Sequence, residues 1–344
     1  MMLRSLLIGA ALVLCGAGAL AQQAPGSPAQ QAPSLNERLT GDLVPTHDPV
    51  IAREGDTYYV FGTGHGDRLV ETKSSPDLVH WTAGAPVFTK LPDWAPKAVP
   101  GTNGLWAPDI ARVNGRWRLY YSVSTFGSNR SAIGMATNAT LDPKSPKFAW
   151  RDEGLVVQSM PSDDFNAIDP NFVIDRQGRH WLSLGSFWSG IKLFELDKKT
   201  GKLLHPKEKR FSLARRMAPA GAAAPIEAPF IVPHGDYYYL LVSYDYCCKG
   251  VNSTYYTAVG RSKDITGPYV GKDGSPLMEG QGTIFLRADL QEKQRFRGPG
   301  HAGWLHDKDG RDYVVYHAYD REKNGAPTLR IAPVTWGADG WPVA

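Results

Sequence analysis

The chain has 344 residues, of which 42% are apolar and 21% are charged, and its formal net charge at pH 7 is +4. This composition is typical of a folded protein with a sizeable core and excludes general disorder. The small positive excess is spread along the chain without a basic cluster interleaved with aromatics, so we exclude nucleic acid as a partner.

The first 21 residues have the pattern of an export signal. Arg4 gives a positive start, an apolar stretch follows to Leu20, and Ala19-Leu20-Ala21 is a small-residue cleavage site. An uncleaved anchor is the alternative, but the apolar stretch is short for a membrane span. We therefore predict that the mature protein is secreted or periplasmic and makes no membrane contact once residues 1–21 are removed.

Residues 22–36 predict a linker. They begin with QQAPGSPAQQAP, a Pro/Gln/Ala sequence without the side chains that build a core. Residues 37–344 are then predicted to form one domain. Alternating runs of Val, Ile, Tyr and Trp dominate this domain, whereas helix-period patterns are scarce, so we expect an all-β fold.

One pattern recurs five times in this domain. An acidic residue or a histidine opens a short apolar run, and a Gly-containing turn then leads into an aromatic run. The lead residues are spaced 61, 60, 58 and 74 residues apart and are Asp48, Asp109, Asp169, Glu227 and His301. A near-constant spacing of this size indicates a repeat architecture.

Each repeat predicts a hairpin, a third strand and a variable fourth strand. One such sheet cannot bury both of its faces alone, so neighbouring repeats must stack. Units of roughly 60 residues lie within the range of propeller blades, and we predict a five-bladed β-propeller. A two-sheet sandwich is the alternative, but it does not explain the recurring lead position. The segment before Asp48 is the candidate to pair with the last blade.

The lead residues predict an active site at one mouth of the central channel. In a propeller the first strand of each blade lines this channel, so equivalent residues converge there. Carboxylates disfavour burial unless they are paired or take part in a reaction. Each one could instead cap a turn, but four acids and a histidine in register favour chemistry.

Two adjacent cysteines, Cys247 and Cys248, remain after the signal segment is removed. An oxidising compartment favours a disulfide between them. Two half-buried thiols are the alternative, because neighbouring cysteines can join only through a strained ring.

Seven motifs resemble those of the arabinanases of glycoside hydrolase family 43, in the same order along the chain. They are HDPVI around Asp48, LWAPDI around Asp109, NAIDPNF around Asp169, SFWSGI from Ser186, IEAPFI around Glu227, CCKGVNSTY from Cys247 and GPGHAG around His301. The resemblance covers nearly the whole chain from about residue 40. It implies that residues 37–344 are a catalytic domain.

The implied activity is inverting hydrolysis of α-1,5-L-arabinofuranosidic bonds in arabinan and arabino-oligosaccharides, by an arabinan endo-1,5-α-L-arabinosidase. An exo-acting arabinanase, an arabinofuranosidase and a β-xylosidase of the same family are alternatives. A non-catalytic carbohydrate-binding propeller is an alternative of another class. Binding alone would not require Asp48, Asp169 and Glu227 together, which argues against that last alternative.

The resemblance assigns three catalytic residues. Asp48 would be the general base that activates water, and Glu227 the general acid that protonates the glycosidic oxygen. Asp169 would orient the acid and raise its pKa through its negative charge. Asp109 matches an acidic position that we interpret as mainly structural.

The resemblance also implies contacts with the arabinose next to the cleaved bond. The implied residues are Asp48, Gly127, Asn166, Ala167, Ile168, Asp169, Ser186, Phe187 and Trp188. Trp106 and Phe187 are the best candidates for stacking on a furanose ring. Packing inside a blade is the alternative for Trp106.

The resemblance implies that His301 holds a structural calcium ion in the channel, largely through water molecules. One imidazole is an unusual ligand for a cation that prefers oxygen. A histidine hydrogen-bonded to the central carboxylates without a metal is therefore the alternative. We expect the protein to be a monomer.

Overall fold

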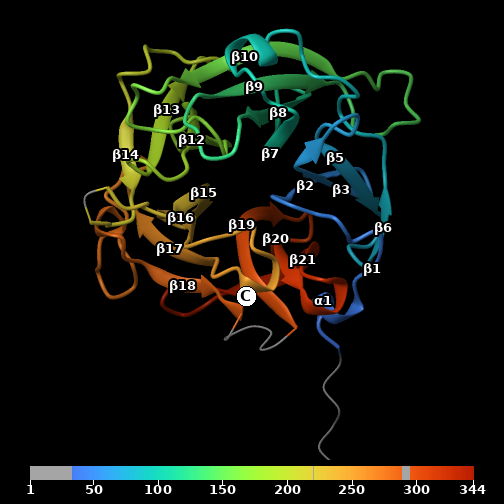
Figure 1. Ribbon diagram of the computed structural model, residues 1–344. Coiled ribbons are helices and arrows are strands. Elements are labelled where there is room, and N and C mark those ends of the chain that lie inside the picture. Colours follow the sequence, from blue (N-terminus) through green and yellow to red (C-terminus); the bar gives the residue numbers. More distant parts are fainter. Residues whose placement is uncertain (1–32, 220, 289–294) are drawn as a thin grey trace, which may run out of the picture. The chain divides into compact units, whose positions relative to one another are not determined.

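Five β-sheets follow one another along the chain and stand in a ring (Figure 1). The computed structural model describes residues 33–219, 221–288 and 295–344, and the folded unit runs from Ser34 to Ala344. The predicted signal peptide and most of the predicted linker lie outside these described residues. The all-β, five-bladed propeller predicted from the repeat is confirmed.

The first two blades each contain five strands. In sheet order, blade 1 consists of β1 (Thr40–Gly41), β6 (His80–Ala83), β5 (Glu71–Ser75), β3 (Thr57–Gly62) and β2 (Val50–Glu54). Blade 2 consists of β10 (Arg151–Ser159), β9 (Ser131–Asn138), β8 (Arg116–Val123), β7 (Gly104–Val113) and β4 (Gly64–His65).

The other three blades each contain four strands. Blade 3 consists of β11 (Asn171–Ile174), β12 (His180–Leu184), β13 (Ile191–Leu196) and β14 (Phe211–Ala214). Blade 4 consists of β15 (Ile226–His234), β16 (Tyr237–Tyr244), β17 (Tyr256–Ser262) and β18 (Thr283–Leu286). Blade 5 consists of β19 (Phe296–His306), β20 (Asp312–Asp320), β21 (Ala326–Trp336) and β22 (Pro342–Val343).

Helices are few and short in the part of the chain that the structure describes. They are α1 (Leu35–Arg38), α2 (Ala95–Ala98) and the 3₁₀ turns η1 (Gly250–Asn252), η2 (Leu277–Glu279) and η3 (Arg321–Lys323). Among these residues, none of the helices has the length and apolar character needed to cross a membrane.

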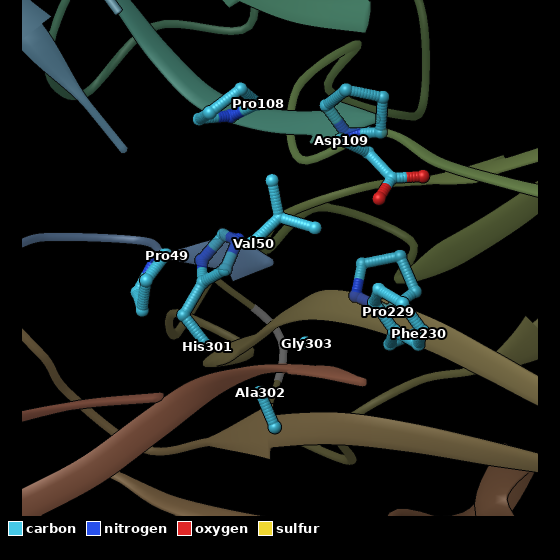
Figure 2. Close-up of a pocket in the computed structure, with 10 residues that line it drawn as sticks. Pro49, Val50, Pro108, Asp109, Pro229, Phe230, His301, Ala302 and Gly303 are labelled. Carbon is cyan, nitrogen blue, oxygen red and sulfur yellow. The ribbon is translucent and has the colours of Figure 1, made fainter. Parts of the chain in front are cut away.

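The innermost strand of every blade begins just after, or bulges at, a residue with positive φ. These residues are Asp48, Ala107, Asp169, Ala228 and His301, with φ between 43° and 58°. Proline follows in the first four and alanine in the fifth, and the residues that follow line one narrow cavity (Figure 2). They define the structural repeat.

This repeat corrects the register predicted from the sequence. Asp48, Asp169 and His301 are equivalent, as predicted. Ala107 and Ala228 occupy the same position in blades 2 and 4, so Asp109 lies two residues after it and Glu227 one residue before it. Acidity alone misaligned these two blades, because the backbone position is defined by its conformation and by the following proline.

Side chains of the preceding blade hold this position in four blades. The N–H of Ala107 donates to Thr63 Oγ1 at 2.9 Å, and that of Asp169 donates to Ser122 Oγ at 2.9 Å. The corresponding contacts are His301 N–H to Ser243 Oγ at 2.9 Å and Asp48 N–H to His317 Nδ1 at 3.1 Å. Positive φ costs a side-chain-bearing residue about 1–2 kcal/mol, and these fixed contacts help to offset it.

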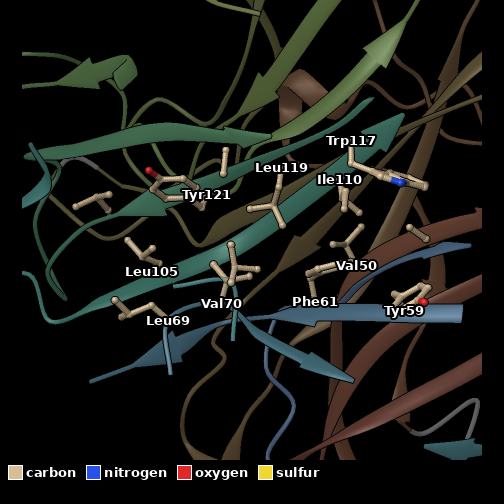
Figure 3. Packing of buried hydrophobic residues seen from close by; sticks show 14 of the residues in the cluster. Val50, Tyr59, Phe61, Leu69, Val70, Leu105, Ile110, Trp117, Leu119 and Tyr121 are labelled. Carbon is tan, nitrogen blue, oxygen red and sulfur yellow. The ribbon is translucent and has the colours of Figure 1, made fainter. Parts of the chain in front are cut away.

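Apolar cores fill the spaces between blades. Alternate residues of one strand face opposite sides, so Val60 packs towards blade 5 while Phe61 packs towards blade 2. Figure 3 shows the core of blades 1 and 2, in which Val50 and Phe61 meet Ile110 and Leu119. Burial of each such side chain contributes about 1.5–3 kcal/mol, so every blade depends on two neighbours.

The N-terminal segment joins the last blade to the first, as predicted in part. Leu43 C=O accepts from Leu329 N–H at 3.0 Å, and Thr46 N–H donates to Pro327 C=O at 2.9 Å, both on β21. However, the strand β1 itself pairs with β6 of blade 1, in parallel. The folded unit also begins three residues before the predicted boundary at residue 37, because Ser34 caps α1 and Leu35 is buried.

Candidate active site

Four titratable side chains at the hub, those of Asp48, Asp169, Glu227 and His301, lie close enough to shift one another's pKa. Asp48, Asp169 and Glu227 all act electrostatically on His301, whose ring is buried among them. The sequence predicted this convergence, and the structure brings these residues together. His301 also lowers the pKa of Asp109, whose contacts differ and are described below.

The carboxylate of Asp48 accepts hydrogen bonds from three side chains. Thr63 Oγ1 lies 2.6 Å and His47 Nδ1 2.8 Å from Oδ2, and His301 Nδ1 lies 3.1 Å from Oδ1. The Thr63 hydroxyl already accepts the N–H of Ala107, so its hydrogen points to Asp48. Oδ2 therefore has both lone pairs occupied, and Oδ1 keeps one for a water molecule.

The electrostatic surroundings keep Asp48 ionised. Burial alone would raise the pKa of Asp48, but attraction to His47 and His301 and their hydrogen bonds outweigh it and hold the pKa well below its usual range. About 13% of the side chain remains exposed. An ionised, partly accessible carboxylate can act as a general base.

Glu227 lies in surroundings that favour its protonated form. Burial is the largest cause that raises the pKa of its carboxyl, and the negative charge of Asp48 adds to it. Hydrogen bonds from Tyr255 to Oε1 at 2.8 Å and from Ser186 Oγ to Oε2 at 2.9 Å oppose the rise. Two carboxyls with pKa values displaced in opposite directions are the arrangement needed for one base and one acid.

Asp169 lies beside the acid and contacts its backbone. Its Oδ2 accepts the N–H of Ala228, the residue after Glu227, at 3.1 Å. Burial raises the pKa of Asp169 well above its usual range, and the charges of Glu227 and Asp48 add to this while His301 opposes it. For Glu227, Asp48 is the carboxylate whose charge raises the pKa. The hydrogen bond from Ala228 therefore supports the predicted role of Asp169 in orienting the acid.

The carboxylates around His301 favour its protonated form. Burial lowers its pKa, but the charges of Asp48, Asp169 and Glu227 outweigh burial and raise it to about 9. A protonated imidazole must lose its proton before it can coordinate a metal. The adjoining cavity holds about 10 Å³, room for one water molecule, whereas calcium takes six to eight oxygen ligands (Figure 2).

Two other groups of side chains bring three metal-ligating atoms near one another within the described residues. His47, Asp48 and His317 form one, but their facing atoms are engaged in the contacts around Asp48. His47, Cys247 and Cys248 form the other, but the two sulfurs are joined in a disulfide. Neither group is a free metal site, and the disulfide is the pairing that an oxidising compartment favours.

Asp109 connects two blades. Its Oδ2 accepts from Phe172 N–H at 2.5 Å and from Asn171 Nδ2 at 3.2 Å. Asn171, two residues after Asp169, makes the equivalent contact in the next blade, where Oδ1 accepts from Ile231 N–H at 2.8 Å. The structural interpretation of Asp109 agrees with this geometry.

The predicted sugar-contact residues lie on loops at the same end of the blades. Ser186 contacts the acid directly, Phe187 lies 6.1 Å from the ring of Tyr246, and Trp188 is 39% exposed. Asn166 is buried with an unpartnered Oδ1, while Ala167 and Ile168 are buried next to Asp169. A Cβ on Gly127 would meet nothing within 4 Å, consistent with an open face there.

Trp106 occupies the position of Glu227 in blade 2, one residue before the positive-φ residue. Its ring is half-buried, 6.3 Å from His65, and its Nε1 has no partner among the described residues. This Nε1 is itself a buried atom, so contact of Trp106 with a ligand stays a prediction.

Sequence reasoning missed four residues of the site: His47, Thr63, Tyr255 and His317. His317 is fully buried and stacks on His47, with ring centroids 4.1 Å apart. Burial holds the pKa of His317 well below its usual range, so its neutral Nδ1 can accept the N–H of Asp48. His47 could have been found, because it occupies in blade 1 the position of Glu227 in blade 4.

Comparison with known families gives one match over most of the chain. The model of the glycosyl hydrolases family 43 matches residues 44–342. An extracellular endo-α-(1→5)-L-arabinanase of Bacillus subtilis is 45% identical over 304 residues, which cover 86% of each chain. An extracellular exo-α-(1→5)-L-arabinofuranosidase of Cellvibrio japonicus is 43% identical over 307 residues, which cover 87% of this chain and 86% of the relative.

Solved structures give the same likeness. An α-L-arabinanase of Cellvibrio cellulosa, solved in complex with arabinohexaose, superposes with a TM-score of 0.81 at 41% identity. The match covers 88% of this chain and 95% of that structure. The fold and the relatives therefore agree over the same part of the chain.

Proposed function

This chain belongs to glycosyl hydrolase family 43, and we propose that it hydrolyses α-1,5-linked L-arabinan with inversion, with Asp48 as general base and Glu227 as general acid. One observation carries the assignment of roles. The surroundings hold the pKa of Asp48 low and raise that of Glu227, so they favour the ionised form of Asp48 and the protonated form of Glu227.

The proposed reaction is a single displacement at the anomeric carbon. Asp48 Oδ1 takes a proton from a water molecule, and the oxygen of this water molecule attacks the anomeric carbon. Glu227 gives its proton to the glycosidic oxygen, the carbon–oxygen bond breaks, and the two sugar products carry the elements of water. Exchange with solvent then returns the proton from Asp48 and supplies one to Glu227. Asp169 keeps the strand beside Glu227 in place through Ala228.

Inversion can be tested directly. Proton NMR of an arabino-oligosaccharide digest, recorded in the first minutes, distinguishes the two anomers before they equilibrate. We expect the β-anomer to appear first from the α-linked substrate. If the α-anomer appears first, the enzyme retains configuration and Asp48 is not a general base.

Endo action is the mode that we propose, and exo action is the second candidate. Relatives of both modes are similar to this chain to nearly the same degree, at 45% and 43% identity. Chromatography of a linear arabinan digest over time separates them, since endo cleavage gives a spread of oligomers at first. A single short product from the start would establish exo cleavage.

We also propose that the protein is exported and acts as a monomer. The names of two relatives describe them as extracellular, which supports export. Sedimentation of the purified protein would test the monomer, and cell fractionation would test secretion against a periplasmic location.

The calcium ion at His301 stays a prediction. The carboxylates around His301 would attract a cation, whereas its raised pKa and the small cavity disfavour one. Activity and thermal stability after treatment with a chelator, and after calcium is restored, would test it. A reversible loss of both would support the ion, and no change would exclude it.

A further inference from the structure

We propose that Tyr319 is a positioning residue for the base Asp48, acting through His47, and that the disulfide-bonded loop 245–255 holds Tyr319 in place. This inference rests on the proposed function, because it assumes that Asp48 takes a proton from water.

Three hydrogen bonds in series connect the loop to the base. The N–H of Cys248 donates to the hydroxyl of Tyr319 at 2.7 Å, and that hydroxyl lies 3.0 Å from His47 Nε2. His47 Nδ1 lies 2.8 Å from Asp48 Oδ2. The series therefore begins at the disulfide and ends on the carboxylate.

The first donor indicates the direction of the series. A backbone N–H can only donate, so the Tyr319 oxygen accepts from Cys248, and we assign the hydrogen of Tyr319 to His47 Nε2. Burial raises the pKa of Tyr319, so the hydroxyl keeps this hydrogen. A His47 ring that accepts at Nε2 carries its hydrogen on Nδ1, where it donates to Asp48. Tyr319 thus selects the tautomer of His47 that holds the base.

Packing leaves these rings little freedom. Tyr319 is 2% exposed, and its ring lies edge-on to His317 at 5.3 Å. A Cβ on Gly298 would come within 3.2 Å of the Tyr319 ring, so glycine allows close approach from β19. His47 stacks on His317 at 4.1 Å. Loss of the Tyr319 hydroxyl would therefore remove a hydrogen bond without removing the packing.

The disulfide constrains the donor that begins the series. A bond between adjacent cysteines closes a small ring that contains the Cys247–Cys248 peptide unit, and this unit carries the N–H that meets Tyr319. Cys248 adopts a positive φ of 65°. The loop is also closed by Thr254 N–H, which donates to Tyr246 C=O at 3.0 Å.

The same loop reaches the acid. It ends at Tyr255, whose hydroxyl donates to Glu227 Oε1 at 2.8 Å. Tyr255 also stacks near His317, with ring centroids 5.9 Å apart. One loop therefore contacts the acid directly and the base through Tyr319 and His47, which explains why a buried tyrosine on β20 matters for catalysis.

The test compares Tyr319→Phe with Tyr120→Phe in the full mature chain. Both substitutions remove one buried hydroxyl that makes a backbone hydrogen bond, and Tyr120 donates to Gly201 C=O at 3.1 Å, away from the site. We expect Tyr319→Phe to lower kcat for linear arabinan by about 10-fold, with KM and the melting temperature as in Tyr120→Phe. Equal kcat in the two variants would overturn the proposal.

Substitutions at His47 add a rescue. The amide of His47→Asn can still donate to Asp48 from near the Nδ1 position, whereas His47→Phe cannot. We expect His47→Asn to keep more activity than His47→Phe, and Tyr319→Phe to cause no further loss in the His47→Asn background. A full further 10-fold loss in that background would mean that Tyr319 does not act through His47.

The disulfide is tested by reduction with dithiothreitol. This reagent is oxidised to its cyclic disulfide, and the protein disulfide becomes two cysteine thiols. We expect kcat of the wild type to fall towards that of Tyr319→Phe, and kcat of Tyr319→Phe to stay unchanged. An equal fall in both proteins would overturn the role of the disulfide. If the untreated wild type does not hydrolyse arabinan, the proposed function itself fails, which these comparisons distinguish from failure of the series.

Discussion

Asp48 lies at the hub just before β2 and Asp109 lies there on the neighbouring inner strand β7, yet their surroundings give them opposite properties. Asp48 accepts from the side chains of Thr63, His47 and His301, and its pKa is held low. Asp109 accepts from the backbone of the next blade, and burial raises its pKa to about 7 although these hydrogen bonds oppose the rise. A carboxylate held by side chains at the mouth can react, whereas one that binds backbone deeper in the ring holds blades together.

Asp48→Asn should give the largest effect in this comparison. The amide keeps an oxygen that can accept from Thr63 but cannot take a proton from water. We expect kcat to fall by about 10²–10⁴-fold while the protein stays folded. Initial rates on arabinan and thermal unfolding would measure this. Activity close to that of the wild type would show that another group is the base.

Asp109→Ala should reverse the pattern, with a loss of stability and little change in kcat. The buried N–H of Phe172 would lose its acceptor, which costs about 1–3 kcal/mol in the free energy of unfolding. Denaturant unfolding would measure it. Asp109→Asn is the matched control, because its carbonyl can still accept from Phe172. A loss of kcat as large as that of Asp48→Asn would remove the distinction between the two residues.

Phe187→Ala extends the comparison to the rim of the site. We expect KM for arabino-oligosaccharides to rise by roughly 2- to 10-fold, since a stacking contact contributes about 0.5–1.5 kcal/mol. Phe211→Ala is the control, because Phe211 is also partly exposed but lies on the outermost strand of blade 3, β14, where it packs near Trp181. A rise of the same size in both variants would argue against stacking at Phe187.

Ser186→Ala should give the smallest effect, a displaced pH profile. The Ser186 hydroxyl lowers the pKa of Glu227, so its removal raises that pKa further. The acid must be protonated, and activity is lost as pH rises through its pKa. The alkaline limb of kcat/KM should therefore move to higher pH, and it should stay in place in Ser189→Ala, whose hydroxyl contacts Asp164. A move to lower pH in Ser186→Ala would contradict the assignment of Glu227 as acid.

The ring of blades was predictable because it follows from alternation and spacing. Successive residues of a strand such as β3 face the two neighbouring blades in turn, and this alternation is visible in the sequence. The register within each blade was less visible. Alignment on Pro49, Pro108, Pro170 and Pro229 would have placed Ala107 and Ala228 beside Asp48, whereas alignment on acidic residues did not.

The hydrogen bonds around the base were not predictable, since they join residues distant in sequence. Thr63 and His317 reach Asp48 from two different blades, and a single chain without aligned relatives gives no sign of such pairs. His47 and Tyr255 lie inside recognised motifs, but their roles depend on side-chain directions that a motif does not contain. The family resemblance predicted the catalytic residues, and the structure adds the side chains that form hydrogen bonds with them.

Glu227→Gln tests the central claim most directly. The amide keeps the size of the side chain but has no proton to give to the glycosidic oxygen. Release of reducing sugar from linear arabinan and calorimetric binding of arabino-oligosaccharides would be measured on the same protein. We predict that hydrolysis falls by about 10²–10⁴-fold while the dissociation constant stays within a few-fold of the wild type. Near-normal hydrolysis by Glu227→Gln would contradict the proposed mechanism.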